Sequence, residues 1–453
     1  MSNQYLQPII NIGMLGSVSD GKSTTVYSLT GIKTQRHSNE MKRNITIKPG
    51  YANMKIYKTI NTNEEPLGSD INTKEGKLIH HVSFIDCPGH YQLIVTMMSC
   101  IRLMDGIILV VSAAEDINKK PQLIQHIMAI KMSGIKNVIV LLNKLDLVKK
   151  SVAIDRYNKL CTVLKKYDIE PKVIIPVSMN HKIGVDNVLK SIMKYMGPDY
   201  VQERNKQKSL FMISRSFDIN HVNIKYDEIV GGVIGGSLIG GNLKIGDEIE
   251  ILPGIIGKNP DGTLNHKPHY SVITSLKSET TDLQEITSGG LIGIGTNIDP
   301  FYCKNDNMIG MLAGLKGTLP DVYYEITIKY TEIEFDEYIW NKFESKPITI
   351  IVGTNSIEGK ILNYNDNHND NHIHLRLNKP ACIPDDSIVI LCEKSPDAFH
   401  IVAYGNYNKS DNQYEFIKEQ KDNTNHTTNQ DDNNHQDDNN HQDDNDSIDL
   451  DDI

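Results

Sequence analysis

Residues 16–23 constrain this chain more than any other stretch. They read Gly-Ser-Val-Ser-Asp-Gly-Lys-Ser and match the pattern G-x-x-x-x-G-K-[ST]. The apolar residues 9–15 before them predict a buried strand, and residues 23–30 after them predict a helix. Glycines let the backbone wrap around a phosphate, and the N–H groups at a helix N-terminus attract an anion. A chance glycine-rich turn is the alternative, but the strand-loop-helix context favours a phosphate-binding loop.

Two further segments supply groups that nucleoside triphosphate hydrolysis needs. Thr46 lies between the loop and the next strand, where it would close over Mg²⁺ only while a γ-phosphate is present. Asp86 follows a buried-strand pattern and would support the metal, while Gly89 lets its N–H approach the γ-phosphate. We expect His90 to orient the attacking water as the catalytic residue. The predicted metal ligands are Ser23, Thr46 and Asp86.

The base would be read by Asn143-Lys144-Leu145-Asp146, an N-K-x-D element at the end of a buried strand. The Asp146 carboxylate can accept hydrogen bonds from N1 and N2 of guanine, and adenine offers no such pair of donors. A later strand, 173–176, is followed by residues that would help to close the base pocket. These motifs in this order predict a GTPase. The predicted GTP-binding residues are Gly16, Ser19, Asp20, Gly21, Lys22, Ser23, Thr24, Gly89, Asn143, Lys144, Asp146, Ser178, Met179 and Asn180.

A chain of 453 residues is too long for a single hydrophobic core. The first ~200 residues alternate strand-like and helix-like stretches, which is typical of a parallel α/β sheet. Short strands with glycine-rich turns follow, and they predict two antiparallel β-barrels. The predicted divisions are an α/β P-loop GTPase domain over 1–203, barrels over 204–320 and 321–410, and a disordered Asn/Asp-rich acidic tail over 411–453. In the first barrel we expect turns at 231–232, 235–236, 240–241 and 253–254.

The charge is distributed unevenly along the chain. Residues 421–453 hold eleven Asp and one Lys, and they account for the whole net charge of −10. Residues 33–58 hold seven basic residues against the single acid Glu40, beside the phosphate loop. This basic stretch is either a solvated face or a contact for an RNA backbone. No run approaches the ~18 apolar residues of a membrane span, and the six cysteines show no C-x-x-C spacing, so neither a zinc ribbon nor a disulfide framework is indicated.

The sequence resembles the gamma subunit of eukaryotic and archaeal translation initiation factor 2 over nearly all of residues 9–320. Residues 39–53 look like that family's first switch, and 235–254 and 289–300 resemble its first barrel. The resemblance implies a GTPase that binds GTP or GDP with Mg²⁺ and carries methionylated initiator tRNA to the small ribosomal subunit. It also implies alpha and beta partner subunits, GTPase-activating and exchange factors, no membrane partner, and a cytoplasmic location (the host cytoplasm if the source is a virus). The residues expected to contact tRNA are Tyr51, Lys42 and Arg43.

Two alternatives and some departures from the family accompany this resemblance. Ser17 and Asp20 stand where many translational GTPases carry histidine, and the stretch after Cys392 has little positive charge. One alternative is an elongation-type carrier of many aminoacyl-tRNAs, but the sequence of the first barrel favours the initiation family. The other is a non-hydrolysing mimic that sequesters the alpha and beta subunits. The motif residues argue against the mimic, which need not keep them: Lys22, Thr46, Asp86 and His90.

Overall fold

The computed structural model divides the chain into one unit over Met1–Tyr414 and a second over Glu415–Ile453. Among the residues it describes, no helix is long and apolar enough to cross a bilayer. Lys42, Arg43 and residues 412–453 of the predicted acidic tail lie outside the described residues. The described residues are 6–34, 46, 48–59, 67–69, 76–117, 120–197, 204–221, 223–333, 346–365, 371–395 and 399–411.

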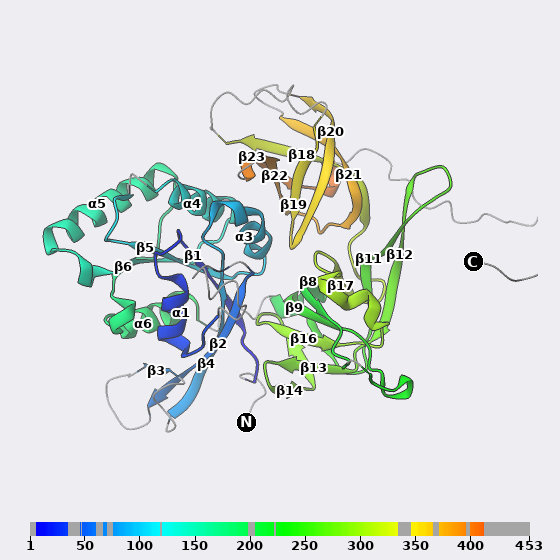
Figure 1. Ribbon diagram of the computed structural model, residues 1–453, viewed down its shortest axis with the longest axis horizontal. Coiled ribbons are helices and arrows are strands. Elements are labelled where there is room, and N and C mark those ends of the chain that lie inside the picture. Colours follow the sequence, from blue (N-terminus) through cyan, green and yellow to red (C-terminus); the bar gives the residue numbers. More distant parts are fainter. Residues whose placement is uncertain are drawn as a thin grey trace, which may run out of the picture. The chain divides into compact units, whose positions relative to one another are not determined.

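A seven-stranded sheet forms the first part of the chain, in the order β3-β2-β4-β1-β5-β6-β7. The five strands from β4 to β7 in that order are parallel, whereas β2 pairs antiparallel with both β3 and β4. The strands are β1 (Ile10–Leu15), β2 (Gly50–Thr59), β3 (Leu67–Ser69), β4 (Gly76–Asp86), β5 (Gly106–Ser112), β6 (Val138–Asn143) and β7 (Val173–Pro176). The helices are α1 (Lys22–Thr30), α3 (Ile94–Ile101), α4 (Pro121–Ser133), α5 (Lys150–Lys166) and α6 (Val185–Tyr195), which Figure 1 shows around the sheet.

The central strands β1, β5 and β6 are fully buried and mostly apolar, as expected where helices cover both faces of the sheet. In β5, Ile107 and Leu109 belong to the core that contains residues of α3, α4 and α5. The alternate residues Ile108 and Val110 belong to the opposite core, which contains residues of α1 and α6. This layering places the carboxyl ends of β1, β4, β5 and β6 together, and the predicted motifs follow those ends.

The first barrel is built from antiparallel strands around one apolar core. Its main sheet has the order β12-β11-β17-β8-β9-β16-β13-β14, and β10 pairs separately with β15. The strands are β8 (Leu210–Phe217), β9 (Val233–Gly240), β10 (Asn242–Lys244), β11 (Glu248–Lys258), β12 (Leu264–Val272), β13 (Ser275–Ser278), β14 (Thr281–Leu283), β15 (Glu285–Thr287), β16 (Ile292–Gly295) and β17 (Leu312–Leu315).

Two of the expected turns in the first barrel are wrong. Gly235 and Gly236 lie inside β9, where a side chain at Gly236 would have its Cβ 1.9 Å from the Met212 carbonyl oxygen. Pro253 and Gly254 lie inside β11, where the register with β12 shifts. Glycine therefore marks a close backbone approach at the first position and a β-bulge at the second. The glycines at 240–241 do connect β9 to β10 as expected.

The second barrel closes fully, in the order β18-β21-β20-β19-β22-β23. Its strands are β18 (Val322–Glu332), β19 (Ile348–Val352), β20 (Asn355–Asn365), β21 (His372–Cys382), β22 (Ser387–Lys394) and β23 (Phe399–Tyr407). The described short 3₁₀ segments are η2 (Tyr91–Leu93), η4 (Leu145–Leu147), η5 (Met179–His181), η7 (Arg204–Lys206), η8 (Tyr226–Glu228), η9 (Pro300–Asp306) and η11 (Lys409–Asp411). The sequence therefore predicted the fold class correctly: an α/β domain followed by antiparallel barrels.

Candidate nucleotide-binding site

The phosphate loop joins β1 to α1 and has the backbone geometry that its glycines permit. Gly16 has a φ of 137°, and a Cβ there would lie 2.2 Å from the Val110 carbonyl oxygen. Gly21 has a φ of 101° and forms the N-cap of α1. The Lys22 ammonium group is buried and donates to the Ser17 carbonyl at 2.9 Å. These contacts hold the loop around the N-terminus of α1, where backbone N–H groups attract anions.

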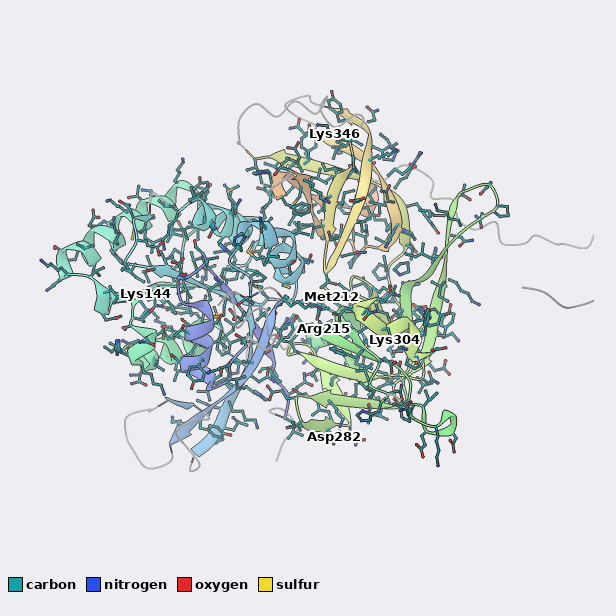
Figure 2. All side chains as sticks on the ribbon, viewed as in Figure 1. Lys144, Met212, Arg215, Asp282, Lys304 and Lys346 are labelled. Carbon is teal, nitrogen blue, oxygen red and sulfur yellow. The ribbon has the colours of Figure 1, made fainter. Side chains whose placement is uncertain are left out.

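An open cavity lies over this loop. Motifs that are far apart in the sequence contribute to its walls, among them the motif of Lys144, which Figure 2 labels in the α/β domain. The lining residues are Val18, Ser19, Gly21, Lys22, Ser23, Thr24, Thr46, Gly89, His90 and Lys144. Its polar lining and its position at the carboxyl ends of the strands suit a phosphorylated ligand.

The three predicted metal ligands converge beside the cavity. Ser23 Oγ donates to Asp86 Oδ2 at 2.6 Å and lies 3.3 Å from Thr46 Oγ1. Thr34, which the sequence interpretation did not include, also donates to Asp86 Oδ2 at 2.6 Å. Asp86 Oδ1 is buried and has no hydrogen-bond partner among the described residues. Hydroxyl and carboxylate oxygens are the ligands Mg²⁺ prefers, so these residues fit the ion that the nucleotide chemistry requires.

The charge state of Asp86 depends on its surroundings. Burial raises the pKa of its carboxyl group, while hydrogen bonds from Ser23 and Thr34 and the nearby Lys22 oppose the rise. Burial likewise lowers the pKa of the Lys22 ammonium group, and the Asp86 charge opposes this shift most. A buried carboxyl group and a buried amino group therefore lie beneath the cavity with little water around them, in a region where electrostatic effects are strong.

The D-x-x-G turn packs directly on the phosphate loop. A side chain at Gly89 would have its Cβ 2.9 Å from the Gly16 carbonyl oxygen and 2.3 Å from Lys22 Nζ. His90 lines the cavity, and its Nδ1 accepts from the Gln92 N–H at 3.3 Å. His126 of α4, a buried residue that the sequence reading missed, hydrogen-bonds to the Gly89 backbone. The turn thus lies between the loop and α4.

The residues predicted to recognise guanine are joined by hydrogen bonds. Asn143 Nδ2 donates to the Asp20 carbonyl at 3.0 Å, and Asn143 Oδ1 accepts from the Met179 N–H at 3.1 Å. Ser178 Oγ donates to Asp146 Oδ1, and this hydrogen bond lowers the pKa of Asp146. Asn143 therefore ties the phosphate loop to the segment after β7, and Asp146 stays ionised beside it. Asn180 follows in η5.

The side chain of Asp20, one of the predicted GTP-binding residues, is fully buried. Its carboxylate accepts from the Ser17 N–H at 2.9 Å and the Ser112 N–H at 3.1 Å, and it pairs with Lys120. Lys120 lies 100 residues away in the sequence, just before α4, and no local pattern marked it.

The segment after Thr46 reaches the first barrel. Lys48 Nζ pairs with Asp306 Oδ2 at 3.0 Å, and Asp306 also pairs with Arg215 of β8, a residue labelled in Figure 2. Tyr51, in β2, forms a side-chain hydrogen bond with Ser214, and burial raises the pKa of its phenol. Tyr51 is thus packed against the barrel rather than fully exposed.

Comparison with known proteins agrees with this arrangement. The elongation factor Tu GTP binding domain family matches residues 7–198. The chain is 40% identical over 338 residues to eukaryotic translation initiation factor 2 subunit gamma of Schizosaccharomyces pombe, covering 72% of this chain and 75% of that one. It is 41% identical over 320 residues to translation initiation factor 2 subunit gamma of Sulfurisphaera tokodaii, covering 68% and 75%.

Solved structures share the fold at lower identity. A bacterial selenocysteine-specific elongation factor, EF-Sec, superposes with a TM-score of 0.65 at 24% identity, covering 88% of this chain but 58% of its own. Elongation factor SelB from Methanococcus maripaludis, with the GTP analogue GppNHp, gives a TM-score of 0.66 at 18% identity, covering 89% and 79%.

A P-loop domain with guanine-recognition motifs, followed by antiparallel barrels, defines a translational GTPase. The matched family model supports the same class and implies guanine-nucleotide binding. Within that class, the identity and coverage of the curated relatives decide the family. The chain belongs to the gamma subunits of translation initiation factor 2.

Proposed function

We propose that this GTPase carries methionylated initiator tRNA to the small ribosomal subunit while GTP is bound. The family relationship supports a role in translation initiation. Beyond this role, we propose that initiator tRNA is its cargo and that it acts in the cytoplasm. Its proposed protein partners are alpha and beta subunits and GTPase-activating and exchange factors.

One observation carries the proposal: a single short segment contacts both the nucleotide site and the first barrel. Thr46 lies at the Ser23–Asp86 hydroxyl and carboxylate cluster. A few residues later, Lys48 pairs with Asp306 and Tyr51 bonds to Ser214. A γ-phosphate that orders Thr46 would thereby set the position of Tyr51 against the barrel. We expect the aminoacyl end to lie beside Tyr51, because an aromatic ring can stack on a terminal base.

The nucleotide chemistry follows from the residues around the cavity. Ser23, Thr46 and Asp86 would hold Mg²⁺, which neutralises charge on the phosphates when it is bound. Lys22 faces the phosphate positions, and Gly89 leaves room for its N–H to approach the γ-phosphate. His90, at the edge of the cavity, would orient the attacking water. Asp146 would select guanine through two accepted hydrogen bonds.

Filter binding tests the cargo directly. With a non-hydrolysable GTP analogue, the chain should bind methionylated initiator tRNA more tightly than an elongator aminoacyl-tRNA. GDP should weaken initiator binding by roughly 5- to 150-fold, the usual range of coupling between two sites. By linkage, the tRNA should tighten GTP relative to GDP by the same factor.

Substitution at Tyr51 tests the coupling route. Tyr51→Ala should weaken tRNA binding while leaving GTP affinity unchanged, and Tyr51→Phe should show how much depends on the hydroxyl bonded to Ser214. Tyr270→Ala is a matched control, because Tyr270 is an exposed tyrosine elsewhere on the first barrel. Equal binding of both tRNAs would favour the elongation-type carrier, and indifference to tRNA and nucleotide alike would favour the sequestering mimic.

A further inference from the structure

The phosphate loop contains a buried carboxylate of the same charge sign as its ligand. Asp20 is fully buried, and both its oxygens face the protein interior rather than the cavity. An anionic group directly behind the loop repels phosphate unless a cation compensates for it. The loop therefore needs a positive partner other than Lys22, whose ammonium group faces the cavity and bonds to Ser17.

Lys120 is that partner. Its side chain is only 5% exposed, and its ammonium group pairs with Asp20 Oδ1. Its second partner, Glu115, lies 3.4 Å away and has a 54% exposed side chain, so solvent screens that charge far more. The main charge opposite Lys120 is therefore the Asp20 carboxylate of the phosphate loop.

The same end of α4 is attached to the loop at a second point. Gln122 Oε1 accepts from the Val18 N–H at 3.4 Å, two residues before Asp20. Asp20 in turn accepts from the Ser17 N–H, so its carboxylate fixes the loop backbone on which the phosphates would rest. Electrostatically, Asp20 raises the pKa of Lys22 and Lys120 lowers it, which couples the three charges.

We propose that Lys120 is a positioning residue of the phosphate site. It neutralises Asp20 and, through Asp20, holds residues 17–20 in the conformation that receives the phosphates. Without Lys120, the negative charge of the buried Asp20 carboxylate would be uncompensated and would repel an anionic ligand bound to the loop. This inference rests on nucleotide binding by the chain and is independent of the proposed tRNA cargo.

Fluorescence titration with mant-GTP and mant-GDP tests the proposal on the full chain with Mg²⁺. Lys120→Met should weaken both nucleotides by about tenfold or more, since the Asp20 charge is then uncompensated. The loss should be larger for GTP, which carries one more negative charge than GDP. Asp20→Asn removes the repulsive charge but also one of the two oxygens that accept backbone hydrogen bonds, so its affinity for both nucleotides should stay close to that of wild type.

The double variant Asp20→Asn/Lys120→Met separates a charge effect from a structural one. It should recover most of the affinity lost in Lys120→Met, because no buried charge is left unpaired. Lys131→Met is the matched control, because Lys131 lies in α4, the helix that follows Lys120, and pairs with Asp168 at 3.0 Å on the surface. This variant should leave affinity unchanged. Melting temperatures of the nucleotide-free variants report whether each is folded.

A double variant as weak as Lys120→Met, or a Lys120→Met chain with wild-type affinity, would overturn the proposal. If Lys120→Met does not fold, the nucleotide affinity of the single variant Asp20→Asn is compared with that of the double variant Asp20→Asn/Lys120→Met. Loss of Lys120 should then matter little, and a large loss of affinity would refute the assignment. Wild-type nucleotide binding without any preference for initiator tRNA would refute the proposed cargo and leave the role of Lys120 intact.

Discussion

At the scale of single residues, we expect selection of the base to depend on one carboxylate held in place by a neighbour. Ser178 donates to Asp146, which keeps Asp146 ionised and fixes one of its oxygens. Asn143 connects the same region to the phosphate loop through Asp20 and Met179. Hydrogen bonds therefore join the predicted base site to the phosphate loop, although their motifs are more than a hundred residues apart.

Asp146→Asn should shift the preference of the chain from GTP toward xanthosine triphosphate. Xanthine presents an acceptor where guanine has an amino donor, and an amide side chain can donate where a carboxylate cannot. Competition titrations with GTP, ATP and xanthosine triphosphate measure the change. Wild type that binds ATP as tightly as GTP would contradict the role of Asp146.

His90→Ala should slow GTP hydrolysis by roughly tenfold or more while GTP affinity stays nearly unchanged. The expectation follows from the position of His90 at the cavity edge, in a turn whose Gly89 packs on the phosphate loop. Single-turnover hydrolysis with the activating partner present is the measurement. A variant that hydrolyses at the wild-type rate would remove His90 from the mechanism.

At the scale of elements, α4 supports the whole phosphate region. The stretch leading into it carries Lys120, which pairs with Asp20, and its middle carries His126, which bonds to the Gly89 backbone. Its apolar residues, such as Leu123 and Ile127, are fully buried in the core beneath the sheet. A helix packed in this way cannot shift without moving both the loop and the D-x-x-G turn.

His126 should make stability depend on pH. Burial, with a smaller contribution from Lys22, lowers its pKa from 6.5 to about 3. Between these values the unfolded chain binds a proton that the folded chain does not, so the free energy of unfolding falls as the pH drops from 6.5 toward 3. Above pH 6.5 both states are neutral, and this contribution is constant.

Denaturant unfolding of wild type and His126→Leu across that range measures the effect. The variant lacks the titrating ring. The difference in unfolding free energy between variant and wild type should therefore shift steadily in favour of the variant as the pH falls below 6.5. A difference in unfolding free energy that stays constant from pH 7.5 to pH 4 would contradict the assignment. Lys131→Met serves as a control on the same helix.

At the scale of the whole molecule, buried polar contacts join the GTP-binding domain to the first barrel. Asn11 Nδ2 donates to Ser237 Oγ at 2.8 Å, and the Asn11 N–H donates to Asp105, which pairs with Arg204 before the barrel. Together with the Tyr51–Ser214 contact, they connect β1 and β2 to the barrel. These residues belong to the Met1–Tyr414 unit.

Removal of the residues after Asn412 should leave nucleotide affinity and melting temperature unchanged. The segment from 421 onward is dominated by Asp, Asn and His and holds too few apolar residues to build a core. Thermal melting and mant-GDP titration of the truncated and full chains test this. A clear drop in melting temperature would mean that the tail stabilises the rest of the chain.

The sequence by itself determined the phosphate loop, the D-x-x-G and N-K-x-D elements, the fold class and the family. Each of these depends on short-range pattern: a few residues at fixed spacing, or apolar runs with a strand or helix period. The Ser23–Asp86 contact was also predictable, because the carboxyl ends of neighbouring parallel strands meet at one edge of a sheet.

Only the tertiary structure decided which distant side chains complete the site. Thr34 on Asp86, Lys120 on Asp20, His126 on Gly89 and Ser214 on Tyr51 pair residues that are 37 to 163 positions apart, and no local spacing records them. The glycines at 235–236 were misread for the same reason, since a close approach by another strand cannot be distinguished from a turn without the packing. Burial makes these contacts necessary, because a charged or polar group removed from water must find a partner wherever the fold supplies one.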